Sequence, residues 1–183
     1  MKICDLNPGP GIGASAWHVE MDDHGLLMDA GTHPKLEGAP ALPLYDTIRE
    51  RPVDAIAFTH CHHDHVGSLP VALRLFPRAH VMMTELSYFI IERVLHNSVN
   101  VMKRQADEKG IAEYPLYTHR EVDELAPLFQ GYRYNREIEW GAFEKAARGQ
   151  TSPTLEFHDA GHALGSAGIM VRGKKETLFY TGD

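Results

Sequence analysis

Cysteine is scarce in this sequence of 183 residues, which contains Cys4 and Cys61 and no others. Two cysteines do not make the disulfide framework of a small secreted domain. The segment 1–5 is not followed by an uninterrupted apolar stretch, so no signal peptide is predicted. No apolar run approaches the roughly 20 residues that a transmembrane helix needs. These absences predict a protein of the reducing cytoplasm that has no membrane partner.

Basic residues are also in short supply. Lys and Arg number 18 against 25 Asp and Glu, which gives a formal net charge of −7. A domain that grips nucleic acid by charge alone usually has a basic excess. Two bound divalent cations would nevertheless offset about four of these charges, and the ions rather than lysines would then meet a phosphate. Net charge therefore does not decide the substrate.

The chain is long enough for one domain with a sizeable core, or for a piece of a larger one. β-Prone apolar runs alternate with helical patterns, which predicts an α/β fold. A turn signal over residues 22–25 predicts that the second and third strands form a hairpin. Strands are predicted at 3–6, 16–21, 25–29, 53–59, 79–84, 154–159, 167–172 and 177–180.

The predicted helices begin at recognisable caps. Ser68 precedes one that has Pro70 in its first turn, and Thr84 precedes a long one. Thr118 and Glu121 have the spacing of a capping box. In the long helix Leu86, Ile90 and Val94, with Phe89 between them, form one apolar stripe. Helices are predicted at 44–51, 68–76, 85–105, 118–129 and 142–148.

The most informative motif is the run from Thr59 to Gly67, which contains His60-x-His62-x-Asp64-His65 directly after an apolar strand. Residues two apart in an extended segment point the same way, so His60 and His62 can reach one cation together. Asp64 and His65, just beyond, can turn toward a second cation. Imidazole and carboxylate groups suit zinc or a similar first-row ion. A chance cluster in a chain with 12 histidines is the alternative, but the strand, the carboxylate and the following helix would all have to coincide with it.

Two later residues can complete such a centre. His162 lies in a glycine-rich turn between two strands, and a zinc held by His60 and His62 still needs a third protein ligand. Asp183 follows the last predicted strand in Thr181-Gly182-Asp183. It can fill the remaining role, that of a carboxylate bridging two cations. Taken alone, each would be read as an ordinary turn residue.

Four segments of the chain resemble, in order, the four motifs of the metallo-β-lactamase superfamily. They are Asp29-Ala-Gly, the His60 to His65 motif, His162 in Gly-His-x-x-Gly-Ser, and Thr-Gly-Asp183. The stretch His33-Pro34-Lys-Leu36-Glu37-Gly38 and the run Gly67-Ser-Leu-Pro70 are similar to the β-CASP branch. Within that branch they most resemble the nuclease subunit of the pre-mRNA 3′-end cleavage machinery and its bacterial and archaeal relatives.

This resemblance implies a four-layer αββα sandwich with a dinuclear zinc centre at one edge. Position by position, His60, His62 and His162 would hold the first ion, Asp64 and His65 the second, and Asp183 would bridge the two. Asp64 would also orient the attacking hydroxide. Asp29 would be a carboxylate behind the ligands that fixes their geometry, although a plain turn residue at the end of a strand remains the alternative. His33, Cys61 and His63 are interpreted as non-ligands.

In β-CASP enzymes a second domain follows the Thr-Gly-Asp motif and completes the active site. We therefore expect residues 1–183 to be the N-terminal part of a longer nuclease, inactive alone, with one tight zinc site and a weak or empty second one. The complete protein is expected to be a metal-dependent hydrolase that cleaves RNA phosphodiester bonds in RNA processing. The alternatives are another hydrolase of the same fold, acting on a thioester or a lactam, a non-catalytic scaffold subunit, or DNA as the substrate.

Overall fold

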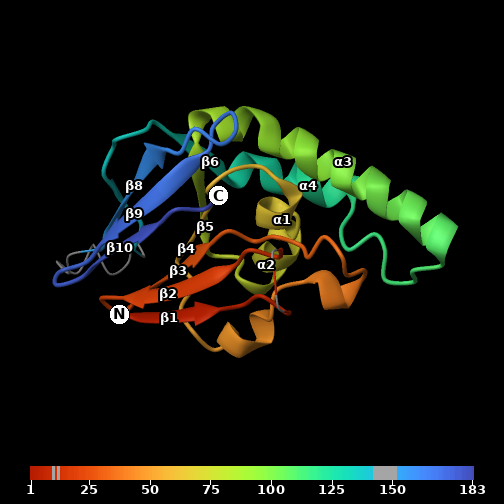
Figure 1. Ribbon diagram of the computed structural model, residues 1–183, viewed down its shortest axis with the longest axis horizontal. Helices are drawn as coiled ribbons and strands as arrows, with labels where there is room; N and C mark the ends of the chain where they lie inside the picture. Colours follow the sequence, from red (N-terminus) through yellow and green to blue (C-terminus); the bar gives the residue numbers. More distant parts are fainter. Residues whose placement is uncertain (10, 12, 142–151) are drawn as a thin grey trace.

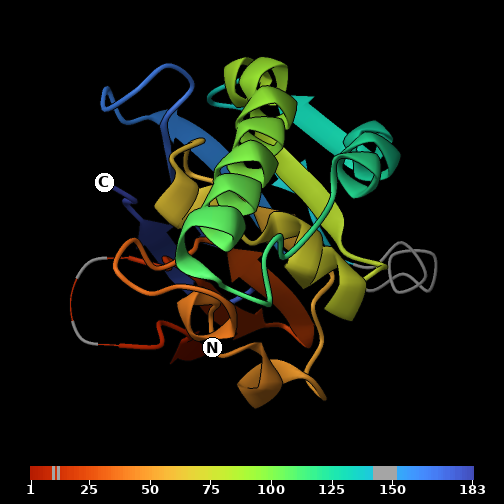
Figure 2. The same cartoon turned by 90° about the vertical axis from the view of Figure 1, so that its right-hand side faces the viewer.

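The computed structural model describes residues 1–9, 11, 13–141 and 152–183. Within them two β-sheets pack face to face, and helices cover the outer face of the first sheet (Figures 1 and 2). The described residues thus form three layers, α, β and β, of the four that the sequence predicts. The predicted α/β fold with two facing sheets is confirmed.

The first sheet has six strands in sequential order: β1 (Lys2–Asp5), β2 (Trp17–Met21), β3 (His24–Met28), β4 (Ala55–Ala57), β5 (His80–Thr84) and β6 (Phe129–Tyr132). Strands β1 to β3 are antiparallel, and β3 to β6 are parallel. The predicted hairpin is confirmed: Met21 pairs with His24. The two residues between them, Asp22 and Asp23, both have the positive φ that a tight two-residue turn requires. Strands β3 and β4 are buried along their whole length, as is usual for parallel strands inside a sheet.

The second sheet is antiparallel and has the order β10-β9-β8-β7, from β7 (Ile138–Glu139), β8 (Thr154–Asp159), β9 (Ala167–Arg172) and β10 (Thr177–Tyr180). Its inner face, with Phe157, Ile169 and Val171, packs on Leu26 and Met28 of the first sheet. A backbone hydrogen bond of 2.7 Å from the N–H of residue 167 to the carbonyl of residue 59 also joins the two sheets. This link lies at the edge where the sequence motifs meet.

The helices are α1 (His63–Val66), α2 (Leu69–Leu75), α3 (Glu85–Lys109) and α4 (His119–Leu125), with short 3-10 turns η1 (Ala39–Ala41), η2 (Tyr45–Ile48) and η3 (Ala126–Leu128). A second core fills the space between them and the first sheet. The predicted caps of α3 and α4 are confirmed, because Thr84 accepts from the N–H of Ser87 and Thr118 forms a complete capping box with Glu121. Ser68 does precede α2, but its hydroxyl contacts the Tyr45 hydroxyl at 2.6 Å instead of capping the helix.

The predicted apolar stripe of α3 is confirmed in part, because Ile90 and Val94 are partly buried and pack against the core. Leu86 and Phe89 are 41% and 76% exposed, whereas Ile91, Leu95 and Val99 are fully buried. Both sets recur with helical spacing, so periodicity alone does not separate them. The second set continues to Met102 and is longer, so it buries more apolar surface against the sheet.

The predicted helix 118–129 is too long at its C-terminal end. Helix α4 ends at Leu125, and the chain makes a 3-10 turn through Pro127, which has no N–H to extend the helix. Phe129 then begins β6, which pairs in parallel with β5 and was not predicted; neither was β7. The predicted helix 44–51 is the 3-10 turn η2. The predicted helix 142–148 lies outside the described residues.

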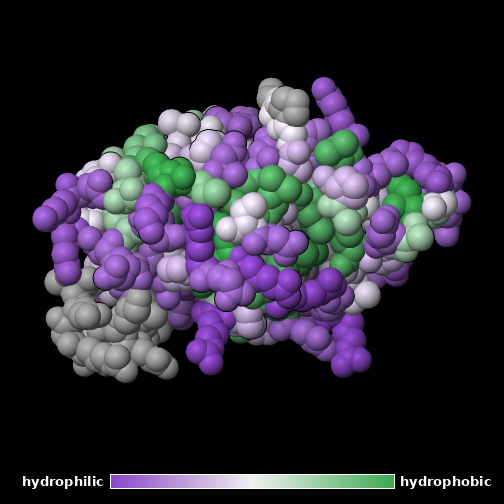
Figure 3. All heavy atoms as spheres, turned by 90° about the horizontal axis from the view of Figure 1, so that it is seen from below, coloured by the Kyte–Doolittle hydropathy of each residue, from purple (hydrophilic) through white to green (hydrophobic). Residues whose placement is uncertain are grey.

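The surface mixes polar and apolar side chains. Figure 3 shows one face on which hydrophobic residues gather near the centre, among hydrophilic ones. Such a mixture is ordinary for a globular domain. Among the described helices, none combines the length and the apolar character that crossing a membrane would require.

Candidate metal centre

The motifs singled out in the sequence meet at one edge of the sandwich. Asp29 directly follows β3, and His60 follows β4, whose C-terminal end lies beside that of β3 because the strands are parallel. His162 lies in the loop between β8 and β9, and Asp183 follows β10. Sites in α/β folds commonly form at the carboxyl ends of parallel strands. The packing of the two sheets therefore brings distant parts of the sequence to a common site.

The motif 60–65 is held by its backbone. The carbonyls of His63, Asp64 and His65 accept hydrogen bonds from the N–H groups of residues 32, 15 and 30, at 3.2, 2.9 and 2.7 Å. A side chain at Gly31 could not be accommodated, because its Cβ would lie 1.6 Å from the carbonyl oxygen of Asp64. This close approach explains the glycine that follows Asp29-Ala30. The loop after β3 and the motif after β4 are thus fixed against each other.

The first group of possible metal ligands comprises three histidines. The Nε2 atom of His60 lies 3.0 Å from Nδ1 of His62, which in turn lies 3.3 Å from Nε2 of His162. His60 is buried at the base of the group, and the other two are exposed. Ligands each about 2.1 Å from a tetrahedral zinc lie about 3.4 Å apart, so these separations fit one ion.

A second group shares His60 and adds His65 and Asp183, with all donor atoms within 4.8 Å of one another. Nε2 of His65 lies 3.5 Å from Oδ1 of Asp183. Oδ2 of Asp64 is 3.9 Å from the same nitrogen, so Asp64 lies beside this group. All six residues predicted as ligands therefore converge at the same edge.

Asp29 lies behind both groups and is fully buried. Its carboxylate accepts hydrogen bonds from the backbone N–H and the hydroxyl of Thr59, at 2.8 and 2.9 Å, and from the Tyr180 hydroxyl at 3.0 Å. It also accepts one from Nδ1 of His65 at 2.8 Å. Because Nδ1 donates to Asp29, Nε2 is the atom of His65 that faces Asp183. Partners of this kind fix the tautomer and orientation of a metal-binding histidine.

Thr59 extends the influence of Asp29 to His60. Its hydroxyl donates to the carboxylate and so can accept from Nδ1 of His60, 3.0 Å away, which leaves the Nε2 lone pair of His60 facing His62. Burial, together with the neighbouring charge of His65, lowers the pKa of His60 to about 4, so its ring is neutral at physiological pH. Burial also lowers the pKa of His65, but the hydrogen bond and the charge of Asp29 outweigh it and raise that pKa overall. Metal binding requires a free lone pair, which the neutral ring of His60 provides and which His65 provides once an ion displaces the proton from its Nε2.

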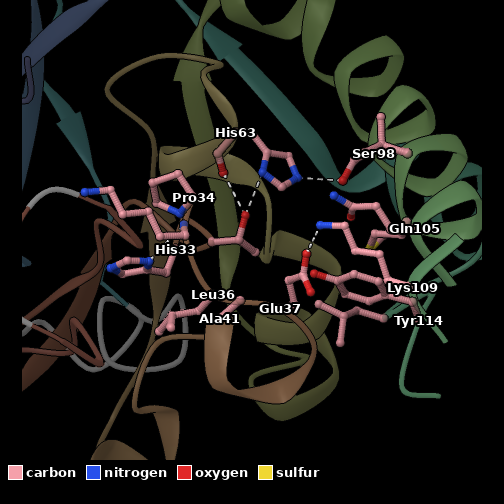
Figure 4. Close-up of a pocket in the computed structure, with 15 residues that line it drawn as sticks. His33, Pro34, Leu36, Glu37, Ala41, His63, Ser98, Gln105, Lys109 and Tyr114 are labelled. Carbon is pink, nitrogen blue, oxygen red and sulfur yellow. Dashed lines mark hydrogen bonds and ion pairs between the residues drawn. The ribbon is translucent and has the colours of Figure 1, made fainter. Parts of the chain in front are cut away.

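The remaining histidines and the cysteine of this region point elsewhere. His63 turns into a pocket of about 340 Å³ between segment 32–37 and α3, where its ring nitrogens contact the hydroxyls of Thr32 at 2.7 Å and Ser98 at 2.6 Å (Figure 4). His33, which also lines this pocket, accepts a hydrogen bond from the N–H of residue 35. Burial raises the pKa of the Cys61 thiol to about 11. The orientation of these side chains agrees with their interpretation as non-ligands.

Two residues that hold the centre together were missed in the sequence. Thr59 and Tyr180 both bind Asp29: Thr59 is the first residue of the run 59–67 but has no predicted role, and Tyr180 directly precedes Thr181-Gly182-Asp183. Burial, and then the charge of Asp29, raises the pKa of the Tyr180 hydroxyl above its usual value, so it remains a donor. A threonine preceding His60 and a tyrosine preceding Thr181-Gly182 were the available signals. Neither specifies a partner without the fold.

Comparison with known proteins gives a consistent result. The family model described as "Metallo-beta-lactamase superfamily" matches residues 9–183. A ribonuclease from Thermus thermophilus is 32% identical over the whole chain, which spans 38% of that protein. The cleavage and polyadenylation specificity factor subunit 3-I of Arabidopsis thaliana is 28% identical over 99% of the chain, which spans 24% of that protein.

Solved structures share the fold. An archaeal metallo-β-lactamase superfamily protein from Sulfolobus tokodaii superposes with a TM-score of 0.56 at 17% identity, covering 92% of this chain and 59% of the other. These matches confirm the predicted resemblance. The family binds metal, and the described residues include His and Asp groups placed to hold an ion. The chain therefore belongs to the metallo-β-lactamase superfamily.

Proposed function

We propose that this domain is the metal-binding part of a zinc-dependent ribonuclease of the β-CASP branch. The observation that carries the proposal is a pair of adjoining donor groups, joined at His60 and oriented from behind by Asp29. Two zinc ions would be held in the proposed centre. His60, His62 and His162 would hold the first, Asp64 and His65 would hold the second, and Asp183 would contribute to both.

The surrounding residues have distinct roles in hydrolysis. Bound zinc supplies a Lewis acid for the phosphoryl oxygens and lowers the pKa of a water molecule toward neutrality. Asp64, partly exposed beside His65, is placed to accept a hydrogen bond from that water and to orient it. Asp29 and Thr59 keep the lone pairs of the ligand histidines directed inward. The exposed rim formed by His62, His162 and Asp183 leaves the centre open to a long substrate.

RNA is the proposed substrate for two reasons. The relatives that match the whole chain include proteins named as a ribonuclease and as a cleavage and polyadenylation factor subunit. In the segment 33–38, which resembles the β-CASP branch, residues 33–37 line the pocket of His63. A net charge of −7 is compatible with this substrate because the ions, rather than a basic patch, would contact the reacting phosphate.

In a complete nuclease of this kind, we propose that residues 1–183 form the lactamase-like domain and that a β-CASP domain supplies the further contacts to RNA. The free cysteines, Cys4 and Cys61, suit the reducing cytoplasm that we propose as its location. The group of three histidines should bind zinc more tightly than the second group, whose ligands within residues 1–183 are Asp64, His65 and the shared Asp183.

Adjacent histidines of the motif provide a matched test of the centre. His62→Ala removes a proposed ligand, whereas His63→Ala removes a ring that faces the Ser98 pocket. We expect zinc titration of the polypeptide 1–183 to show loss of the tight site in the first variant and its retention in the second. Circular dichroism monitors folding in both. Equal zinc binding by the two variants would remove His62 from the centre.

Activity is tested on the full-length gene product with fluorescent single-stranded RNA. We expect chelator-sensitive cleavage that is lost in His62→Ala, and little hydrolysis of a β-lactam or a glutathione thioester. Single-stranded DNA of the same sequence is assayed in parallel. Rapid thioester or lactam hydrolysis without cleavage of RNA would contradict the proposal. Cleavage of DNA without cleavage of RNA would show that DNA is the substrate instead.

A further inference from the structure

A second cluster of metal-binding side chains lies between α3 and α4. It comprises Glu92 and His96, four residues apart on α3, and Asp123 on α4, with donor atoms within 4.8 Å of one another. Nε2 of His96 is 3.2 Å from Oδ1 of Asp123 and 3.8 Å from Oε1 of Glu92. This cluster shares no residue with the centre described above.

A chain of hydrogen bonds behind His96 determines which of its nitrogens carries a proton. Nε2 of His119 donates to the side-chain oxygen of Asn100 at 3.1 Å, so Nδ1 of His119 has a free lone pair. That lone pair faces Nδ1 of His96 at 2.8 Å, and the two rings are stacked. Nδ1 of His96 is therefore the donor, and its Nε2 is the atom that faces the two carboxylates.

The two carboxylates beside Nε2 of His96 favour a positive charge at this point, which either a proton on Nε2 or a metal ion can supply. When Nε2 is unprotonated, His96, Glu92 and Asp123 present three metal-binding donor atoms within 4.8 Å of one another. Histidines that bind metal commonly donate their other N–H to an acceptor in the way that His96 does toward His119. We propose that Glu92, His96 and Asp123 bind a divalent first-row cation such as Zn²⁺, with water completing the coordination.

The two helices hold the cluster in place before any ion arrives. Glu92, His96 and Asn100 follow one another at intervals of four residues along α3, so they share a face of that helix. On α4, His119 and Asp123 have the same interval. The start of α4 is fixed by the capping box at Thr118, and Arg74 on α2 binds Glu121. The side chains of the cluster therefore need little rearrangement to bind an ion, and a bound ion would link α4 to α3.

The cluster opens to solvent, since Glu92 and Asp123 are exposed and also line a surface pocket of about 390 Å³ with Tyr88 and Phe89. An ion can enter directly from solution. Three protein ligands with a position left for water resemble an open zinc site rather than a closed structural one. The cation would thus act as a reversible clamp between the two helices.

The test counts zinc ions bound by the metal-free polypeptide 1–183 in a calorimetric titration. Asp123→Asn and His96→Gln should each bind one zinc equivalent fewer than the wild type. Glu124→Gln removes the same charge from the next residue of α4, outside the cluster, and should match the wild type. His62→Ala, which affects the other centre, should retain this equivalent, so failure of one proposal is distinguishable from failure of the other.

The hydrogen-bond chain has its own variant. Asn100→Leu leaves all three ligands in place but removes the acceptor for His119, and we expect zinc affinity at this site to fall by about tenfold. Unchanged affinity in that variant would overturn the role of the chain. Wild type, Asp123→Asn and His96→Gln binding the same number of zinc ions would overturn the site itself and leave His96 as a proton-carrying partner of Asp123.

Discussion

The substitution Asp29→Asn tests how much the metal centre depends on a residue that touches no ion. Asparagine has nearly the same size as aspartate. It also tolerates the φ of +60° that residue 29 adopts, so the backbone should be unchanged. The substitution removes the negative charge and replaces one carboxylate oxygen with an N–H₂ group. In the variant this group faces hydrogen-bond donors that bind the carboxylate in the wild type.

The largest loss is expected at His65. Its Nδ1 now donates to the carboxylate at 2.8 Å, and losing a hydrogen bond to a charged group costs roughly 1.5–3 kcal/mol of folding free energy. Opposite the N–H₂ group of the variant, His65 must instead present its Nδ1 lone pair to that amide and carry its proton on Nε2, the atom directed at Asp183. Loss of such an orienting partner typically lowers metal affinity about 10- to 100-fold.

The measurement combines urea unfolding of the metal-free protein with zinc titration. Asp54→Asn is the control, because Asp54 accepts a hydrogen bond from the N–H of residue 25 at 2.9 Å at the opposite end of β4. It should lower the free energy of unfolding without changing zinc affinity. An Asp29→Asn protein with the stability and zinc affinity of the wild type would refute the reasoning.

Three further predictions concern the scaffold. Ile91→Ala should lower the free energy of unfolding by about 2–5 kcal/mol, and Phe89→Ala, at a site 76% exposed, by less than about 0.5 kcal/mol; equal effects in denaturant melts would reverse the assignment of the buried face of α3. Gly31→Ala should abolish tight zinc binding and lower the melting temperature, because the new Cβ would lie 1.6 Å from the Asp64 carbonyl oxygen. A variant with the zinc affinity and melting temperature of the wild type, both measured by calorimetry, would contradict this. Partial burial raises the pKa of Glu121, but hydrogen bonds from Arg74 and Thr118 outweigh it and hold that pKa below its usual value. The stabilising contribution of Glu121 is therefore present above about pH 4.3 and lost as the pH falls through the lower folded pKa. The melting temperature of Glu121→Gln should accordingly approach that of the wild type in acid. A difference in melting temperature that stays constant at every pH would contradict this linkage.

Much of this fold could be predicted from the sequence because its local signals agree with the tertiary structure. The turn at Asp22-Asp23, the cap at Thr84 and the capping box at Thr118 depend on neighbouring residues alone. The proposed ligands also share a simple rule, since each follows the end of a predicted strand. Residues at strand ends converge once two sheets pack, and the six positions do lie at one edge.

What escaped prediction depends on contacts between distant residues. Strand β6 contains Gly131 and Gln130, which are poor local strand signals, and it exists because its backbone pairs with β5. The buried face of α3 is selected by the sheet against which it packs rather than by periodicity. Thr59 and Tyr180 contact Asp29 across 30 and 151 residues of sequence. The cluster at His96 joins two helices, and spacing within either helix shows only half of it.

The origin of the proposed ligands in both sheets sets an order of events during synthesis. His62 and His162 are 100 residues apart, which corresponds to about 5–20 s of translation at roughly 5–20 residues per second. Throughout that interval the nascent chain carries His60 and His62 without His162 or Asp183. Tight zinc uptake must therefore wait for β8, β9 and β10 to dock on the first sheet, so metal loading would mark the completion of folding rather than begin it.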